Sequence, residues 1–354
     1  MEVTTTLPRR VAGVFGRRPL FGALGALVVL VAFAEVALGP VRLGPVDLFS
    51  VLIGNGEPGP TAILLQIRLP RMVLGLAVGM GLALSGCALQ GVLRNPLADP
   101  GLIGVTAGAA VGAVTVIVLG NFFIGDLPAF VRPYALPLGA FVGSIIVTGF
   151  VFTFASRSGG TNVAMLILAG VAVNAIAVAL IGAMVYISDD QQLRDLTFWS
   201  MGSIASGNWM SVAVTSVVAV ASGLFLLRMG RTLDLFQLGE RAAFHAGVDI
   251  ERQKRRIALL TALSVGAVTA AAGPIGFIGL VAPHMARLIV GPAHRHVLPA
   301  AALIGGALIL GADLMVRLAV PPTEPPIGLA TSMIGGPFFL WLLMRRMNRG
   351  GGNA

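Results

Sequence analysis

The sequence predicts an all-α, polytopic membrane protein with about ten transmembrane helices. Hydrophobic residues make up 56% of its 354 residues and charged residues 11%, whereas a soluble domain carries roughly a quarter charged residues. Apolar runs alternate with short polar or Gly/Pro-rich breaks along most of the chain. The net charge of +9 comes from arginines at the ends of these runs. It therefore indicates membrane topology, and a surface that contacts membrane lipid, not nucleic-acid binding.

The first five predicted spans lie in the N-terminal half of the chain. They cover residues 20–38, 72–93, 102–119, 134–155 and 163–187. The first run follows a basic segment and contains Ala-Phe-Ala at 32–34, which resembles a signal-peptide cleavage site. Its length favours an uncleaved helix. The breaks are an outside segment at 39–66, a turn at 94–101 with two prolines, and an inside turn at 156–160.

The second half contains five more spans. They cover residues 209–227, 257–272, 277–290, 298–318 and 327–343. An acidic outside patch at 188–195 precedes a predicted interfacial helix at 196–204. We expect a cytoplasmic N-terminus at 1–19, a transmembrane domain at 20–345 and a cytoplasmic tail at 346–354.

The distribution of basic residues assigns the two sides of the membrane. Three quarters of the 24 basic residues fall on the side that this order of spans makes cytoplasmic. The exceptions are Arg42, Arg68, Arg71, Arg132, Arg194 and Arg317. This bias is the one that the positive-inside rule expects, so both termini are predicted to be cytoplasmic.

The longest interruption is a cytoplasmic loop at 228–256 with seven basic residues. At its centre, Gly239 and Gly247 bracket good helix formers, and Glu240 lies in the first turn, where the helix dipole favours an acid. A short helix of this kind is suited to dock into a partner's cleft. The alternative is a solvated loop whose charges only set the topology.

The sequence provides no motor and no catalytic motif. Its only lysine, Lys254, does not follow the glycine-rich motif of a P-loop, so any ATP hydrolysis must take place in a separate subunit. No nucleophile-elbow or zinc-protease motif is present, and the single cysteine, Cys87, lies in an apolar run. We therefore expect a transport subunit and not an enzyme, with no bound metal and no cofactor on the chain.

Several residues are candidates for partner and substrate contacts. Arg68 and Arg71 lie three apart at the outer end of a span, which favours docking of an acidic partner over a lipid-headgroup anchor. Asp313 and Arg317 lie four apart, a spacing that favours a local ion pair. Arg317 could also reach the outer surface.

Polar residues at the inner ends of spans are candidates for a pore mouth. They are Asn95, beside Leu97, and the pair Thr161 and Asn162, for which helix capping is the rival interpretation. Asn174 lies at membrane depth and should face a bundle interior or a cavity. For His284, packing or hydrogen bonding is favoured over haem ligation.

Six motifs together resemble one family, the FecCD permeases. They are IRLPR at 67–71, SGCALQ at 85–90, RNPLADPGLIGVTAGA at 94–109, GERAAFHAGV at 239–248, GPIGFIGLVAPHMAR at 273–287 and EPPIG at 324–328. FecCD permeases are the membrane subunits of type II ABC importers for siderophores, haem and cobalamin. The resemblance implies the type II ABC importer permease fold, a location in the bacterial inner membrane, and a homodimer with its pore on the dimer axis. Residues 192–203 resemble haem permeases most, so haem is the expected substrate, with a ferric siderophore or cobalamin as alternatives.

The resemblance also implies roles for the candidate residues. ATPase coupling falls to Gly239, Glu240, Arg241, Ala242, Ala243 and Gly247. Docking of a periplasmic or lipid-anchored solute-binding protein falls to Arg68, Arg71 and Arg317, and the inner gate to Asn95, Leu97, Thr161 and Asn162. The expected partners are two ABC ATPases that bind ATP-Mg. An ion-coupled secondary transporter is less favoured, because Glu35 and Asp313 lie near span ends and provide no midplane relay.

Overall fold

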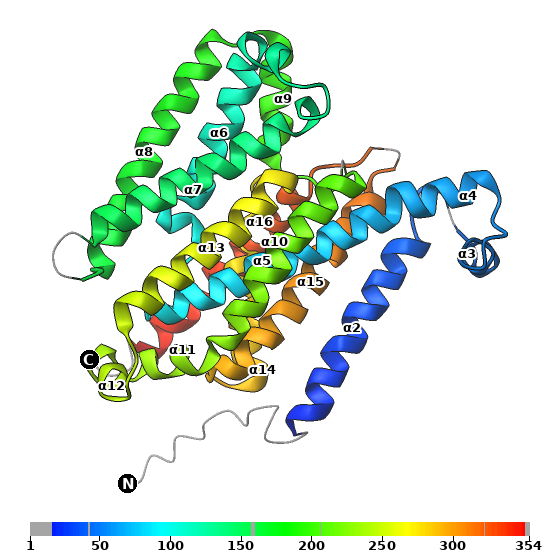
Figure 1. Cartoon of the computed structure of the whole chain (residues 1–354). Helices are drawn as coiled ribbons and strands as arrows, with labels where there is room; N and C mark the ends of the chain where they lie inside the picture. Colours follow the sequence, from blue (N-terminus) through cyan, green and yellow to red (C-terminus); the bar gives the residue numbers. More distant parts are fainter. Residues whose placement is uncertain (1–15, 42, 157–159, 206, 322, 351–354) are drawn as a thin grey trace.

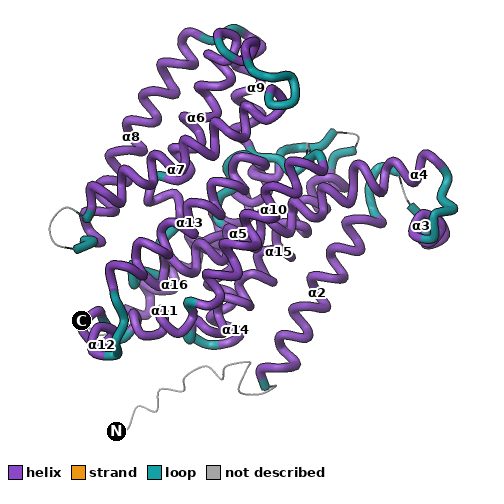
Figure 2. Tube along the Cα trace, in the orientation of Figure 1, coloured by secondary structure: helices purple, strands orange, loops and turns teal. Residues whose placement is uncertain are grey.

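The computed structural model describes residues 16–41, 43–156, 160–205, 207–321 and 323–350. Within these ranges it is all-helical and has no strand (Figure 2). Most of the predicted cytoplasmic N-terminus at 1–19, the end of the tail at 351–354 and the centre of the inside turn at 156–160 lie outside the described residues.

Each of the ten predicted spans corresponds to a helix. The helices are α2 (Arg17–Ala37), α5 (Leu69–Val92), α6 (Val105–Leu119), α7 (Ala135–Ala155), α8 (Val163–Ile187), α10 (Trp209–Arg228), α13 (Ile250–Ala272), α14 (Ile278–Val290), α15 (His294–Ala319) and α16 (Ile327–Gly350). Eight described helices are long and apolar enough to cross a membrane, while α14 and the apolar part of α16 are shorter. The protein is therefore multi-pass.

Helix α5 forms the centre of the bundle and packs against α10, α13, α14 and α15 (Figure 1). Close approach depends on glycines that face one another across the helix contacts. A Cβ on Gly79 would clash with the carbonyl group of Gly305 on α15, and one on Gly86 with the carbonyl of Gly279 on α14. Small residues allow this backbone contact between helices in lipid, where burial of apolar surface drives no association.

Helices α6 to α9, with α9 at Asp190–Met201, form a lobe beside this bundle (Figure 1). The apolar stretches of α2 and α8 are only 11% and 22% buried, whereas that of the rod running from Pro58 to Val92 is 78% buried. The exposed faces of α2 and α8 are apolar, so they are suited to lipid or to another membrane subunit.

The predicted outside segment at 39–66 is more helical than expected, and the helix of the second span begins before residue 72. The segment contains α3 (Pro45–Leu52), α4 (Pro58–Ala62) and most of a π-helix (Ile63–Arg68) that runs directly into α5. Pro58 starts α4, where a missing N–H is harmless. Pro70 follows the π-helical turn, where the hydrogen-bonding register changes, so the helix continues past the proline.

Other predicted loops are also helical. The cytoplasmic loop at 228–256 contains α11 (Gly230–Gln237), α12 (Glu240–His245) and the first turns of α13. Helix α9 begins at Asp190 and not at 196, because Asp189 accepts a hydrogen bond from Gln192 N and forms a capping box. Helix α15 begins at His294, ahead of the predicted 298. The third span is interrupted by a 3-10 turn at Pro100–Ile103 and by Gly104 at φ +79°.

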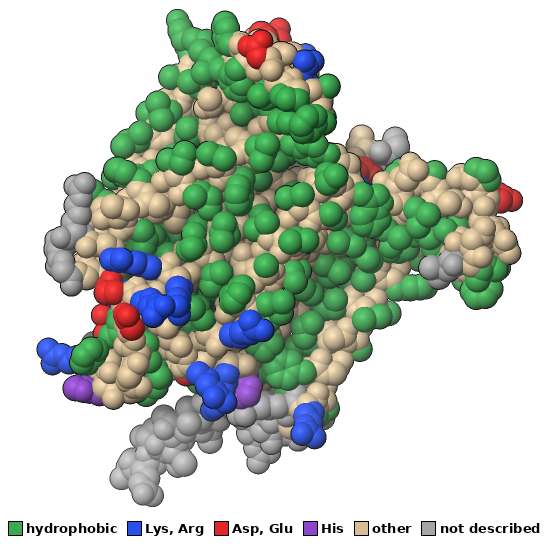
Figure 3. All heavy atoms as spheres, viewed as in Figure 1, with side chains coloured by type: hydrophobic (Ala, Val, Ile, Leu, Met, Phe, Trp, Pro, Cys, Tyr) green, Lys and Arg blue, Asp and Glu red, His purple; other side chains and the backbone are tan. Residues whose placement is uncertain are grey.

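The two ends of the bundle carry different elements. The start of α2, the end of α16, α11 and α12 lie at one end, and α3, α4 and α9 lie towards the other (Figure 1). On the face shown in Figure 3, charged side chains gather near the ends, and hydrophobic side chains cover the middle. This arrangement agrees with the predicted order of inside and outside segments.

Candidate functional site

The predicted short helix of the cytoplasmic loop is present as α12. Gly239 at φ +105° precedes it and Gly247 at φ +82° follows it, both in the left-handed region that favours glycine. Ala243 is fully buried, whereas Phe244 is 66% exposed. The exposed side chains of this helix are Arg241, Ala242, Phe244 and His245. An exposed aromatic side chain on a basic end of the molecule is suited to a protein contact.

Behind α12 lies Lys254, whose side chain is 3% exposed. Its Nζ atom lies 3.0 Å from Glu240 Oε1 on α12 and 3.4 Å from Glu251 Oε1 on its own helix, α13. It also donates a 2.9 Å hydrogen bond to the carbonyl oxygen of Thr161. One buried ammonium group thus connects α12, α13 and the turn between α7 and α8. In the sequence, Lys254 stands out only as a lysine that follows no P-loop motif, and its spacing does not predict these contacts.

Glu251 makes a second connection to the same turn. Its Oε2 atom accepts hydrogen bonds from Thr161 N at 2.8 Å and from Thr161 Oγ1 at 2.7 Å. Ser156 Oγ lies 3.0 Å from Thr161 Oγ1. Thr161 is therefore buried and anchored to α13, and it does not cap α8.

The other predicted pore-mouth residues have local partners. Asn162 caps α8, because its Oδ1 atom accepts from Ala164 N and Met165 N. Asn95 Oδ1 accepts from Leu97 N at 2.9 Å, which fixes the turn after α5. Asn174 donates to Gly101 O at 3.3 Å and so contacts the break before α6. Lys254 connects Thr161 to α12, whereas Asn95 lies in the turn after α5 and Asn174 lies within α8.

A buried polar cluster joins α5 to the start of α14 near those breaks. Gln90 Nε2 donates to Gly279 O at 3.1 Å and to Ala98 O at 3.3 Å, and Gln90 Oε1 accepts from Arg287. In the turn, Asp99 accepts from Gly101 N at 2.8 Å, and burial raises the pKa of the Asp99 carboxyl. This cluster fixes the inner half of the bundle. In the sequence, no signal apart from the family motifs at 85–90, 94–109 and 273–287 pointed to this cluster.

At the outer end, Arg71 pairs with acids from two segments. Its Nε and Nη2 atoms lie 2.8 Å from the two carboxylate oxygens of Asp313 on α15, and its Nη1 lies 2.5 Å from Glu324 before α16. Arg71 and Asp313 are both buried, whereas the side chain of Glu324 is 36% exposed. Arg71 thus connects three segments.

The predicted local pair between Asp313 and Arg317 is wrong. Asp313 is held by Arg71, and Arg317 Nη2 instead lies 2.9 Å from Glu35 Oε1 and donates to Glu35 O. Arg68 donates to backbone carbonyl groups at the end of α2 and just beyond it, those of Val36, Ala37 and Val41. All three predicted docking arginines are 3–5% exposed. Their guanidinium groups contact distant carboxylates and carbonyls in the interior and do not form the open pair expected from spacing, and Arg317 Nε has no hydrogen-bond partner. The outer charge cluster is defined as Arg68, Arg71, Arg317, Glu35, Asp313 and Glu324.

His284 packs edge-to-face against Phe338 of α16, with ring centroids 6.1 Å apart. In the described part of the chain, no three His, Cys, Asp or Glu side chains gather as a metal site.

A cavity of about 740 Å³ lies between α11, the turn after α5 and the start of α15. Its lining includes Arg94, Arg231 and Arg287, so the end of the molecule that bears α12 is strongly basic.

The chain is similar to known proteins along most of its length. A family model described as the FecCD transport family matches residues 27–345. The chain is 43% identical over 331 residues to the hemin transport system permease protein HmuU of Yersinia pestis, which covers 93% of this chain and 97% of that protein. It is 39% identical over 308 residues to the cobalamin import system permease protein BtuC of Halobacterium salinarum, which covers 87% of this chain and 77% of that protein.

A solved structure is also similar over nearly the whole chain. It is described as an inward-facing conformation of a metal-chelate type ABC transporter, and the two superpose with a TM-score of 0.82 at 32% sequence identity. The match covers 92% of this chain and 99% of the other. The helical architecture is therefore that of an ABC transporter permease.

Proposed function

This chain belongs to the FecCD transport family, and from that membership we propose that it is the membrane-spanning permease subunit of an ATP-driven importer that carries haem. The Yersinia pestis hemin permease shares more residues with it than the archaeal cobalamin permease does, over a larger part of both chains. This difference favours haem over cobalamin. A ferric siderophore remains the other alternative in the same family.

The observation that carries the proposal is the combination of α12 with the absence of a P-loop from the sequence. A glycine-bracketed helix projects exposed side chains from a basic end of the bundle, while the chain has no motif for nucleotide phosphates. We propose that α12 sits on one of two cytoplasmic ATPase subunits. Gly239, Glu240, Arg241, Ala242, Ala243 and Gly247 would make up the coupling surface.

The proposed assembly is a homodimer with the substrate pathway on its axis. The apolar outer faces of α2 and α8 leave room for a membrane-embedded partner as well as for lipid. Thr161 and Asn162, in the turn next to α12, and Asn95 with Leu97 after α5 are the proposed inner gate. Both termini would be cytoplasmic, on the side of α12.

A solute-binding protein would deliver haem at the outer end. We propose that its acidic surface is attracted by three arginines, Arg68, Arg71 and Arg317. Each of these arginines already has acceptors within the chain. An incoming acid would have to compete with Glu324, which is the exposed member of the outer charge cluster. Docking would therefore rearrange this cluster instead of filling an open site.

The decisive experiment is transport by the purified chain reconstituted in proteoliposomes with its ATPase and binding protein. Haem, a ferric siderophore and cobalamin are offered separately, with and without ATP. Uptake of haem that requires ATP and both partners is the expected result. ATP-dependent uptake of another chelate would correct the substrate, and uptake that continues without the ATPase would overturn the importer in favour of an ion-coupled transporter.

A further inference from the structure

We propose that Lys254 is a positioning residue for coupling: its ammonium group ties the coupling helix α12 to Thr161, so that a movement of α12 is passed to the α7–α8 turn and the start of α8. This inference rests on the proposed function, in which an ATPase moves α12. It adds a residue that neither spacing nor resemblance assigned.

The geometry of the contacts matches the chemistry of a lysine. An ammonium group is a compact charge with three donors: Lys254 Nζ donates to Thr161 O at 2.9 Å and to Glu251 Oε1 at 3.4 Å, and it forms an ion pair with Glu240 Oε1 at 3.0 Å. These partners belong to α12, α13 and the α7–α8 turn. A planar guanidinium group carries its donors in a fixed fork and cannot meet three such directions equally well.

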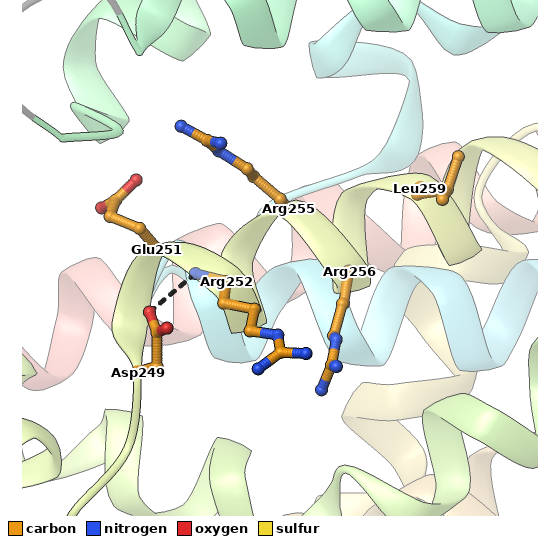
Figure 4. A pocket seen from close by; sticks show the side chains of 6 residues that line it. All are labelled: Asp249, Glu251, Arg252, Arg255, Arg256 and Leu259. Carbon is orange, nitrogen blue, oxygen red and sulfur yellow. Dashed lines mark hydrogen bonds between the residues drawn. The ribbon is translucent and has the colours of Figure 1, made fainter.

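Lys254 differs from the other basic residues of the chain in type and from its neighbouring arginines in burial. The chain has 24 basic residues, and Lys254 is the only lysine among them. Its neighbours Arg252, Arg255 and Arg256 are exposed, and in Figure 4 Arg252 and Arg256 point to one side of α13 while Glu251 and Arg255 point to the other. Those arginines are placed like ordinary positive-inside residues at a helix end. Lys254 is buried instead, where a charge is tolerated only when it is paired.

Thr161 is held on both sides of its backbone. Glu251 accepts from its N–H and hydroxyl groups, and Lys254 donates to its carbonyl oxygen. Asn162, the next residue, caps α8. Because both anchors of Thr161 come from the first two turns of α13, the turn and α13 form one unit, and Lys254 connects that unit to α12 through Glu240.

The first experiment measures coupling in the full reconstituted complex. Lys254→Met keeps an unbranched side chain but removes the three donors, and Glu240→Gln removes the negative charge of the Glu240 side chain on α12. Each variant should lower the haem transported per ATP hydrolysed by about tenfold, within the range of measured coupling effects. The double variant should be no worse than Lys254→Met alone, because both changes break the same connection.

Controls separate the link from general effects of charge and folding. Arg255→Met, at the exposed neighbouring position, should leave the transport ratio unchanged, and Lys254→Arg should give an intermediate ratio. If Lys254→Met does not assemble, Glu240→Gln still tests the link, since the buried ammonium keeps Glu251 and Thr161. A normal ratio in Glu240→Gln, or additive losses in the double variant, would overturn the proposal.

A distance measurement distinguishes the link from the proposed function itself. Spin labels are placed at the exposed positions His245→Cys on α12 and Ala164→Cys at the start of α8, and distances across the dimer are measured with and without ATP. In the native background both distances should change. In Lys254→Met the change at 245 should persist and the change at 164 should shrink.

The possible outcomes lead to different conclusions. If nucleotide moves neither label in the native background, α12 is not coupled to an ATPase, and the proposed function fails together with the link. If both labels move equally in the native and Lys254→Met proteins, the proposed function stands and the link is refuted.

Discussion

Arg71 and Asp313, which lie 242 residues apart in the sequence, form a two-bond ion pair with both N–O distances at 2.8 Å. Both side chains are almost fully buried. The pair joins α5 to α15 at the outer end of the bundle, where the glycine contacts of the same helices begin one helical turn or more further in. It therefore fixes the register between two closely packed helices.

Breaking this pair on one side should destabilise the protein strongly. Asp313→Asn leaves the Arg71 guanidinium without its buried counter-charge, and loss of one partner of a buried ion pair typically costs about 3–5 kcal/mol. Thermal unfolding in detergent would measure the loss. Glu324→Gln, which removes the half-exposed partner of Arg71, should cost less than about 1 kcal/mol. Equal melting temperatures for Asp313→Asn and the unmodified protein would contradict this assignment.

The same cluster predicts an unusual gain of binding. If an acid on the solute-binding protein competes with Glu324 for Arg71, then Glu324→Gln should strengthen docking severalfold, because it removes the competitor and leaves Arg71 in place. Arg71→Gln should weaken docking. Affinity for the binding protein at low and high salt is the measurement. Weaker docking in Glu324→Gln would show that this acid supports the interface instead of competing with it.

Much of the fold could be predicted from the sequence because hydropathy is a local property. Ten apolar runs predicted ten helices, and Gly239 with Gly247 predicted α12. The segments at 39–66 and 228–256 were underestimated, since short polar helices such as α11 have no apolar run to reveal them. Their helical structure depends on tertiary packing of a few side chains, for example Leu233 and Phe236, which are buried.

Ion-pair partners could not be predicted in the same way. The spacing of Asp313 and Arg317 pointed to a local pair, but each side chain found a more distant partner, because the buried end of α15 faces α5 and α2. The sequence shows that Lys254 is the only lysine of the chain. Its three partners lie up to 93 residues away from it in the sequence, and only the folded chain brings them together.

Helix packing gives a prediction with an internal control. Gly86→Ala would place a methyl group against the backbone carbonyl of Gly279, a contact that cannot give way as a side chain can. Gly182, on α8, has open space around its Cβ position. Gly182→Ala should therefore be neutral or stabilising by up to about 1 kcal/mol, while Gly86→Ala should lower the melting temperature and the yield of folded protein. Similar behaviour of the two variants would refute close α5–α14 contact.

The orientation of the bundle in the membrane can be tested by labelling single cysteines. The native Cys87 is fully buried, so a membrane-impermeant maleimide should not reach it in the folded protein. Val46 on α3 is 76% exposed, and His245 on α12 is exposed at the opposite end of the bundle. With α12 on the cytoplasmic side, His245→Cys should react only in inverted vesicles or after permeabilisation, and Val46→Cys should react in intact cells whose outer barrier has been removed.

The basic residues around α12 favour this orientation, since the positive-inside rule places such residues on the cytoplasmic side. Labelling of His245→Cys from outside would place α12 beyond the reach of any ATPase, and the importer mechanism would then be impossible for this chain.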